Sequence, residues 1–239
     1  MSVLYLECGS GINADLMLAS LASLLDDPDE VADMLSSTGL PIAAVSVERS
    51  EPQCTPGIRV RIETGEEKGH CHHGPKDIKS MIDSLKVSDM VKDDAKGVFD
   101  LLAGAEAKVH GESVDTVHFH EVGSLENVSA VVGVCMMMER LSPDDVMSSR
   151  VCTGFGHVHC AHGVLPIPAP ATAALLDGIP VYSGDMEGEF CTPTGAALLQ
   201  HFISSFGDMP SSYQRMGCGL SSKTNDPRML RIFEIICQK

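Results

Sequence analysis

Two histidines stand two residues apart in the stretch DTVHFHEVG, residues 115–123, and this pair is the first feature of the sequence that could do chemistry. If the segment is extended, His118 and His120 present both imidazoles on one face while Phe119 faces the core. Glu121 follows directly and could act as a third metal ligand or orient one imidazole. A metal site, a proton shuttle and a packed or solvated pair all stay open, because a bare His-x-His pattern is a weak indicator.

Further soft or borderline donors accompany this pair between residues 110 and 162. They are His110, His157, His159, Cys160 and His162. Imidazole and thiolate favour nickel, zinc or copper over magnesium, which prefers oxygen ligands. The group therefore indicates a borderline cation, with the alternative that several of these residues only cap strands or loops.

A second, looser cluster is the stretch GHCHHG, residues 69–74, within a polar loop. Three histidines and Cys71 in such a loop could capture an ion transiently, which suits delivery better than tight storage. A solvated polar loop explains the same residues equally well.

Two glycine-bearing turns each precede an expected helix, where backbone N–H groups and the helix dipole can hold a phosphate or carboxylate. The first is ECGSGINAD, residues 7–15, and the second is EGEFCTPTGAALL, residues 187–199. The residues of these turns that we predict to bind an anionic ligand are Gly9, Gly11, Asn13, Thr192, Thr194 and Gly195. Lys223 and Arg228 could add positive charge, although ordinary helix capping explains each turn alone.

Carboxylates close to these motifs supply candidates for a general base. Glu189 is the preferred base because it stands in the second turn, and Asp15 and Glu121 are the other candidates. The sequence contains no Gly-x-Ser-x-Gly, His-Glu-x-x-His or Walker motif, so it predicts neither a serine hydrolase, a zinc protease nor a P-loop enzyme.

The elements that must position these residues follow an α/β or α+β order. A strand, a turn and an apolar helix open the chain, a helix is expected over 28–38, and strands over 43–50 and 57–64. Helices are then expected over 75–111 and 124–141, an extended stretch to residue 160, and alternating helices and strands to the end. We predict a single compact domain with a mixed sheet, in which residues 1–65 could form a lobe, 65–75 a mobile histidine loop and 76–239 the main body.

Composition limits the partners. The formal net charge of −16 argues against nucleic acid, because binding to phosphate backbones needs a cationic face. The nine cysteines include no Cys-x-x-Cys pair and mostly lie in apolar runs, which indicates a reducing compartment. The start lacks the features of a signal peptide, so the sequence predicts a cytoplasmic protein without a membrane segment, and a homo-oligomer stays open.

Several segments, in this order, resemble the LarC family of pyridinium bisthiocarboxylic acid mononucleotide nickel-insertion proteins. They are YLECGSGINADLMLASL, VHFHEVGS, CAHGVLPIPAPAT, GEFCTPTGAALL and MGCGLSSKTNDPRMLR. The resemblance covers essentially the whole chain, and the blocks at 118–123, 160–172 and 192–199 are specific.

This resemblance implies insertion of nickel, with CTP consumed, into a pyridinium mononucleotide that becomes the nickel-pincer cofactor of lactate racemase. It implies metal ligands at His118, His120 and His162, with roles also for Asp15, Glu121, Glu189, Thr192, Thr194 and Gly195. It further implies a separate C-terminal, CTP-linked domain, which a partner chain could supply.

The chain departs from the family pattern at Glu7, Asn13, Ala14, Glu126 and Ala130, where the family usually has Asp, Ser, Gly, Asp and Asp. A non-catalytic nickel-binding or regulatory paralogue is therefore the alternative reading. A nucleotide-ester hydrolase that uses Glu189 and a bound metal is a third.

Overall fold

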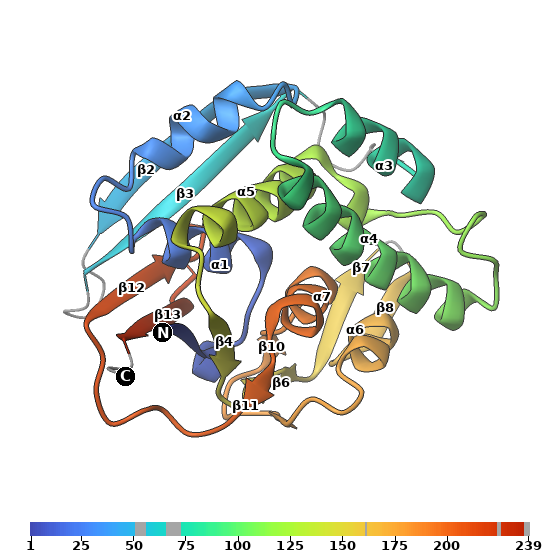
Figure 1. Cartoon of the computed structure of the whole chain (residues 1–239). Helices are drawn as coiled ribbons and strands as arrows, with labels where there is room; N and C mark the ends of the chain where they lie inside the picture. The colour runs from blue at the N-terminus through green and yellow to red at the C-terminus, as the bar shows by residue number, and fades with distance from the viewer. Residues whose placement is uncertain (51–55, 66–72, 161, 224–225, 237–239) are drawn as a thin grey trace.

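The computed structural model describes residues 1–50, 56–65, 73–160, 162–223 and 226–236 (Figure 1). The strands are β1 (Ser2–Glu7), β2 (Ile42–Ser50), β3 (Gly57–Thr64), β4 (Asp145–Ser148), β5 (Val151–Cys152), β6 (Gly154–Phe155), β7 (His157–Cys160), β8 (Gly163–Pro166), β9 (Val181–Tyr182), β10 (Gly188–Glu189), β11 (Ser205–Phe206), β12 (Arg215–Leu220) and β13 (Met229–Ile236). The helices are α1 (Ala14–Ala22), α2 (Glu30–Ser37), α3 (Pro75–Ser84), α4 (Asp89–His110), α5 (Leu125–Leu141), α6 (Pro170–Leu175) and α7 (Pro193–Phe202), with 3-10 turns η1 (Cys8–Ser10) and η3 (Glu121–Gly123).

Seven strands form one mixed sheet in the order β11-β4-β1-β13-β12-β3-β2. The pairs β1/β4, β4/β11 and β3/β12 are parallel, and β1/β13, β12/β13 and β2/β3 are antiparallel. Strands from both ends of the chain therefore meet in the centre of the sheet. The predicted single domain with a mixed sheet and several helices is confirmed.

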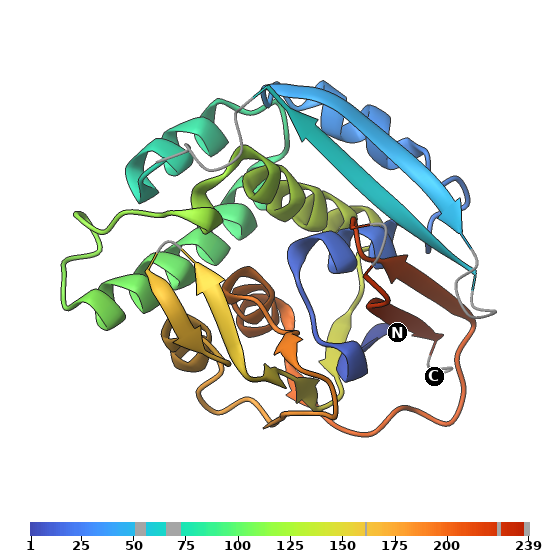
Figure 2. The ribbon, with the colours of Figure 1, turned by 180° about the vertical axis from the view of Figure 1, so that it is seen from behind.

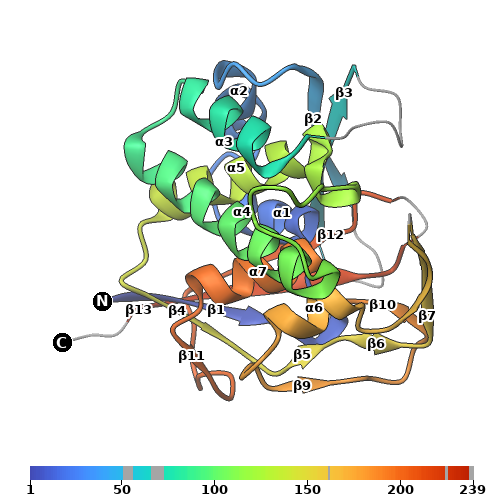
Figure 3. The same cartoon turned by 90° about the vertical axis from the view of Figure 1, so that its right-hand side faces the viewer.

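The main core lies between this sheet and the helices. Leu4 and Leu6 of β1 point into it, and α1 packs on β3, β12 and β13 with α5 alongside (Figure 3). Val3 and Tyr5 alternate to the other face of the sheet, where they form a small cluster with Phe233 and Ile235. The segment after β11 lies against this face, where the Tyr5 hydroxyl donates to the carbonyl of Gly207 at 3.1 Å.

Three short strand pairs form a second layer of the molecule. They are β5/β9, β6/β10 and the hairpin β7/β8. The hairpin lies near α4 and α6, at the opposite end of the molecule from β2 and β3 (Figures 1 and 2). This placement brings β7 and β8 close to the end of the long helix α4.

The expected elements are confirmed, and local signals account for several of the helix ends. Asn13 caps α1 by accepting from the Leu16 N–H at 2.7 Å, and Ser88 and Ser124 cap α4 and α5. Gly111 ends α4 in the left-handed conformation. No helix in the described part of the chain is long and apolar enough to cross a bilayer.

The proposed division into a lobe 1–65, a loop 65–75 and a body 76–239 stays a prediction. Strands β1, β2 and β3 belong to the common sheet, and residues 66–72 of the loop lie outside the described residues.

Candidate functional site

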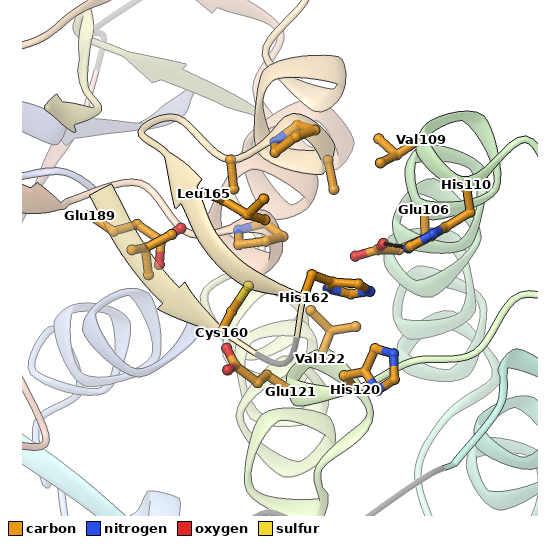
Figure 4. A pocket seen from close by; sticks show the side chains of 15 residues that line it. Glu106, Val109, His110, His120, Glu121, Val122, Cys160, His162, Leu165 and Glu189 are labelled. Carbon is orange, nitrogen blue, oxygen red and sulfur yellow. Dashed lines mark ion pairs between the residues drawn. The ribbon is translucent and has the colours of Figure 1, made fainter. Parts of the chain in front are cut away.

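A cavity of about 190 Å³ opens between the C-terminal end of α4, the η3 turn, the β7/β8 hairpin and the starts of α6 and α7 (Figure 4). Its apolar wall includes Val122, Val158, Leu165, Pro170 and Pro193. The polar and sulfur-bearing side chains around it are Glu106, His110, His120, Glu121, Cys160, His162 and Glu189. Such a mixture of apolar surface and a few convergent polar groups is typical of a small-ligand site.

Two of the three predicted metal ligands meet at this cavity. The ring centroids of His120 and His162 lie 4.8 Å apart, although the residues are far apart in the sequence. His118 is exposed and does not line the cavity. The segment 117–119 is not a strand, and Val117 and Phe119 are buried while His118 faces solvent.

A third imidazole, that of His110, lies beside this pair in place of His118. The His110 ring centroid lies 4.9 Å from that of His162, and the His110 Nε2 lies 3.4 Å from a carboxylate oxygen of Glu106. From the sequence, His110 was predicted only as a further donor near the His-x-His pair, and Glu106 was not predicted at all. Their i,i+4 spacing at the end of the helix was the available signal.

As the side chains stand, the described residues contain no group of three His, Cys, Asp or Glu side chains placed to hold a metal ion. His157 and His159 alternate outward on β7 while Val158 and Cys160 line the cavity. Of the GHCHHG stretch, residues 69–72 lie outside the described residues.

Two of the predicted carboxylates, Glu121 and Glu189, line the same cavity. Burial raises the pKa of Glu189, and the negative charge of Glu121 raises it further, while Arg228 and Lys223 act in the opposite direction. A carboxylate with a raised pKa is a stronger base than an ordinary one, which suits proton abstraction.

Asp15, the third predicted carboxylate, lies in the first turn of α1 outside the cavity lining. Its Oδ2 accepts a hydrogen bond from the Ser222 hydroxyl at 2.7 Å. Burial raises its pKa, Ser222, Lys223 and Arg228 lower it, and Glu126 raises it. Because the same two cations act on Asp15 and Glu189, the two carboxylates share one electrostatic environment.

Arg228 connects this environment to the backbone that carries Glu189. Its guanidinium donates to the Glu189 carbonyl at 2.7 Å and forms an ion pair with Asp226. Burial raises the pKa of Asp226, but hydrogen bonds from Arg228 and Ser221 outweigh this effect and hold it at about 2. Asp226 therefore holds the Arg228 side chain in the position from which it donates to the backbone of β10.

The two predicted anion-binding turns lie side by side. The Ile12 N–H donates to the Phe190 carbonyl at 2.9 Å, and the Thr192 N–H donates to the Ile12 carbonyl at 3.2 Å. This close approach explains two glycines: a Cβ on Gly11 would lie 2.1 Å from the Phe190 oxygen, and one on Gly195 would lie 2.2 Å from the Ile12 oxygen. The N-terminal ends of α1 and α7 are thereby brought together.

The remaining predicted ligand-binding residues surround this junction. Thr192 caps α7 by accepting from the Gly195 N–H at 3.2 Å, and Thr194 is buried in the first turn. The Gly9 carbonyl accepts from the Tyr182 hydroxyl at 3.3 Å. The binding of a phosphate by these residues stays a prediction.

Fold and site together define an α/β protein whose cavity combines imidazoles with carboxylates, a donor set that suits a borderline divalent ion. Residues 4–238 match the family model described as nickel insertion protein. The chain belongs to this family, as its sequence motifs predicted.

Several relatives of the chain carry the name pyridinium-3,5-bisthiocarboxylic acid mononucleotide nickel insertion protein. The one from a strain of Staphylococcus epidermidis is 38% identical over 233 residues, which cover 97% of this chain and 58% of the relative. Those from Staphylococcus saprophyticus and Clostridium kluyveri are each 36% identical, covering 97% and 98% of this chain and 59% and 62% of the relatives. The chain thus spans about three fifths of the length of these relatives, and no solved structure matches it.

Proposed function

We propose that this chain takes part in the insertion of nickel into pyridinium-3,5-bisthiocarboxylic acid mononucleotide, the reaction that completes the nickel-pincer cofactor of lactate racemase. The observation that carries the proposal is the convergence of His120, His162, Glu121 and Glu189 on one cavity, in a chain of the nickel insertion family. Nickel and the mononucleotide are both substrates in this reaction.

The chemistry requires a base. When the carbon–nickel bond forms, the electron pair of a ring C–H bond passes to the new bond, and the proton must leave. Glu189 lies in the cavity with a raised pKa and would accept this proton. Glu121, a second carboxylate of the cavity, would help to hold the positively charged ring and ion.

The phosphate of the mononucleotide would lie at the junction of α1 and α7. Backbone N–H groups at two helix starts favour an anion there, and Lys223 and Arg228 add positive charge close to Asp15 and Glu189. Consumption of CTP is part of the proposal, with a C-terminal region or a partner chain supplying that step.

The test measures product directly. The chain is incubated with nickel, the bisthiocarboxylated mononucleotide and CTP, alone and with the C-terminal region of the Staphylococcus epidermidis relative added, and a nickel-containing product is sought by mass spectrometry. Glu189→Gln should lower the rate by about 10²- to 10⁴-fold, the usual contribution of a general base.

Glu187→Gln is the matched control, because Glu187 is an exposed carboxylate two residues earlier that does not line the cavity. It should keep the wild-type rate. Equal rates in the Glu189→Gln and Glu187→Gln variants would exclude Glu189 as the base. Nickel binding without product in either arrangement would instead indicate the non-catalytic paralogue.

A further inference from the structure

Three imidazoles that line the cavity are neighbours, and one of them, His162, is more than 40 positions from the other two in the sequence (Figure 4). His162 lies between the other two, with its ring centroid 4.9 Å from that of His110 and 4.8 Å from that of His120. They come from the last turn of α4, the residue before η3 and the β7/β8 turn. Long-range folding, and not local sequence, brings them together.

The spacing of the rings matches shared coordination of one ion. With a metal–nitrogen distance of about 2.1 Å and a ring centroid about 1.1 Å beyond the nitrogen, two imidazoles at roughly 90–110° have centroids about 4.5–5.2 Å apart. Both observed separations fall in this interval. As the side chains stand, the rings do not form a coordinating group, so binding of an ion would require each ring to turn about its side-chain torsions until one nitrogen of each faces a common point.

Glu106 gives His110 the support that a metal-binding histidine usually has. The ring nitrogen of such a histidine that does not bind the metal usually donates its N–H to a carboxylate, a backbone carbonyl or water, and this hydrogen bond fixes the orientation of the ring. The Nε2 of His110 lies 3.4 Å from Glu106 Oε2, which leaves Nδ1 for an ion. Glu106 lines the cavity and is only 15% exposed, so its charge is poorly screened by solvent.

We infer that His110, supported by Glu106, is the third imidazole of a nickel site with His120 and His162, in the place that the sequence pattern gave to His118. This site would hold the ion beside the apolar part of the cavity before transfer. The inference rests on the proposed function only for the identity of the ion.

The experiment counts nickel bound by the full chain. All variants carry His70→Asn, Cys71→Ser, His72→Asn and His73→Asn, so that the GHCHHG stretch does not contribute, and this quadruple variant is the reference. Nickel chloride alone is titrated by isothermal calorimetry, and X-ray absorption counts the imidazoles on the ion. The reference should bind one nickel through three imidazoles.

His110→Ala should weaken binding by at least about 100-fold and leave two imidazoles, and Glu106→Gln should weaken it by about 10-fold. His118→Ala is the matched control and should bind as the reference does. His110 lies on the exposed last turn of α4, so its removal should spare the fold; His110→Gln, with thermal unfolding measured in parallel, checks this point.

Absence of nickel binding in the reference, unchanged binding in His110→Ala, or an equal loss in His118→Ala would each overturn the inference. These results are separate from those on the reaction. If product forms normally while His110→Ala binds nickel as the reference does, the inference fails and the proposed function stands. If nickel binding depends on His110 but no product forms, the proposed function fails and the site stands.

Discussion

Asp226 contacts the backbone of Glu189 indirectly, through the side chain of one arginine. Arg228 lies between them, paired with Asp226 on one side and donating to the Glu189 carbonyl on the other. The pKa of about 2 shows that the folded state strongly favours the ionised form of Asp226. A lowered pKa of this kind stabilises the fold above the ordinary pKa of aspartate.

Asp226→Asn should therefore lower the free energy of unfolding at pH 7 by about 1–2 kcal/mol, after allowance for solvent screening. The sign fixes the pH window: the difference from the wild type should be constant above about pH 4 and should shrink as the pH falls toward 2. Urea unfolding at several pH values measures it.

Asp115→Asn serves as the control, because Asp115 and Lys76 form an ion pair that is 76% and 73% exposed. Such pairs contribute little to stability. A pH-independent difference between wild type and Asp226→Asn would show that the lost stability does not come from ionisation of this carboxylate.

Among the elements, α1 and α7 are held together at their N-terminal ends by a contact that tolerates no Cβ. Gly195→Ala would place its Cβ 2.2 Å from the Ile12 carbonyl oxygen, so one of the two helices must shift. We expect a loss of about 1–3 kcal/mol in urea unfolding, the usual cost of overpacking.

The control for this prediction is Gly104→Ala in the middle of α4. A Cβ there meets nothing within 4 Å, so the substitution should stabilise the protein by up to about 1 kcal/mol through helix propensity. A neutral Gly195→Ala would mean that the two helix starts are free to separate.

Helix and strand positions were predictable because their signals are local. Asn13, Ser124 and Gly111 act on the turn beside them, and alternation in the strands reports burial directly. The junction of α1 with α7 was not predictable, because Gly11 and Gly195 serve close backbone contacts to Phe190 and Ile12, which are far away in the sequence. From sequence, both glycines read as ordinary turn or ligand-contact residues.

At the scale of the whole molecule, the fold brings four of the residues predicted from the sequence to one cavity. These are His120, His162, Glu121 and Glu189, and their role toward a borderline ion stays a prediction. The prediction for His118 assumed strand geometry, whereas the structure is irregular there and exposes the side chain. His110 reaches the cavity because it is the last residue of the long helix α4, and no short motif encodes the length and direction of that helix.

The net charge of −16 and the buried carboxyl groups of the site both lower the stability of the fold as the pH rises. Burial raises the pKa values of Asp15 and Glu189, so the folded state holds these protons more tightly than the unfolded state. The stability that this gives is fully present below the unfolded pKa values and is lost as the pH rises through the folded ones. Self-repulsion among the acidic groups adds a loss in the same direction.

Salt separates the two causes. Near 1 M NaCl the Debye length is about 3 Å, which removes repulsion between exposed charges but leaves the burial of Asp15 and Glu189 in place. The double variant Asp15→Asn, Glu189→Gln should then be more stable than the wild type at pH 8 in high salt and nearly equal to it at pH 4. Urea unfolding across this range measures both curves. The opposite result would be that the free energies of unfolding of the wild type and the double variant change equally with pH in high salt. The pH dependence would then come from the surface charge, and burial would not raise the pKa values of Asp15 and Glu189.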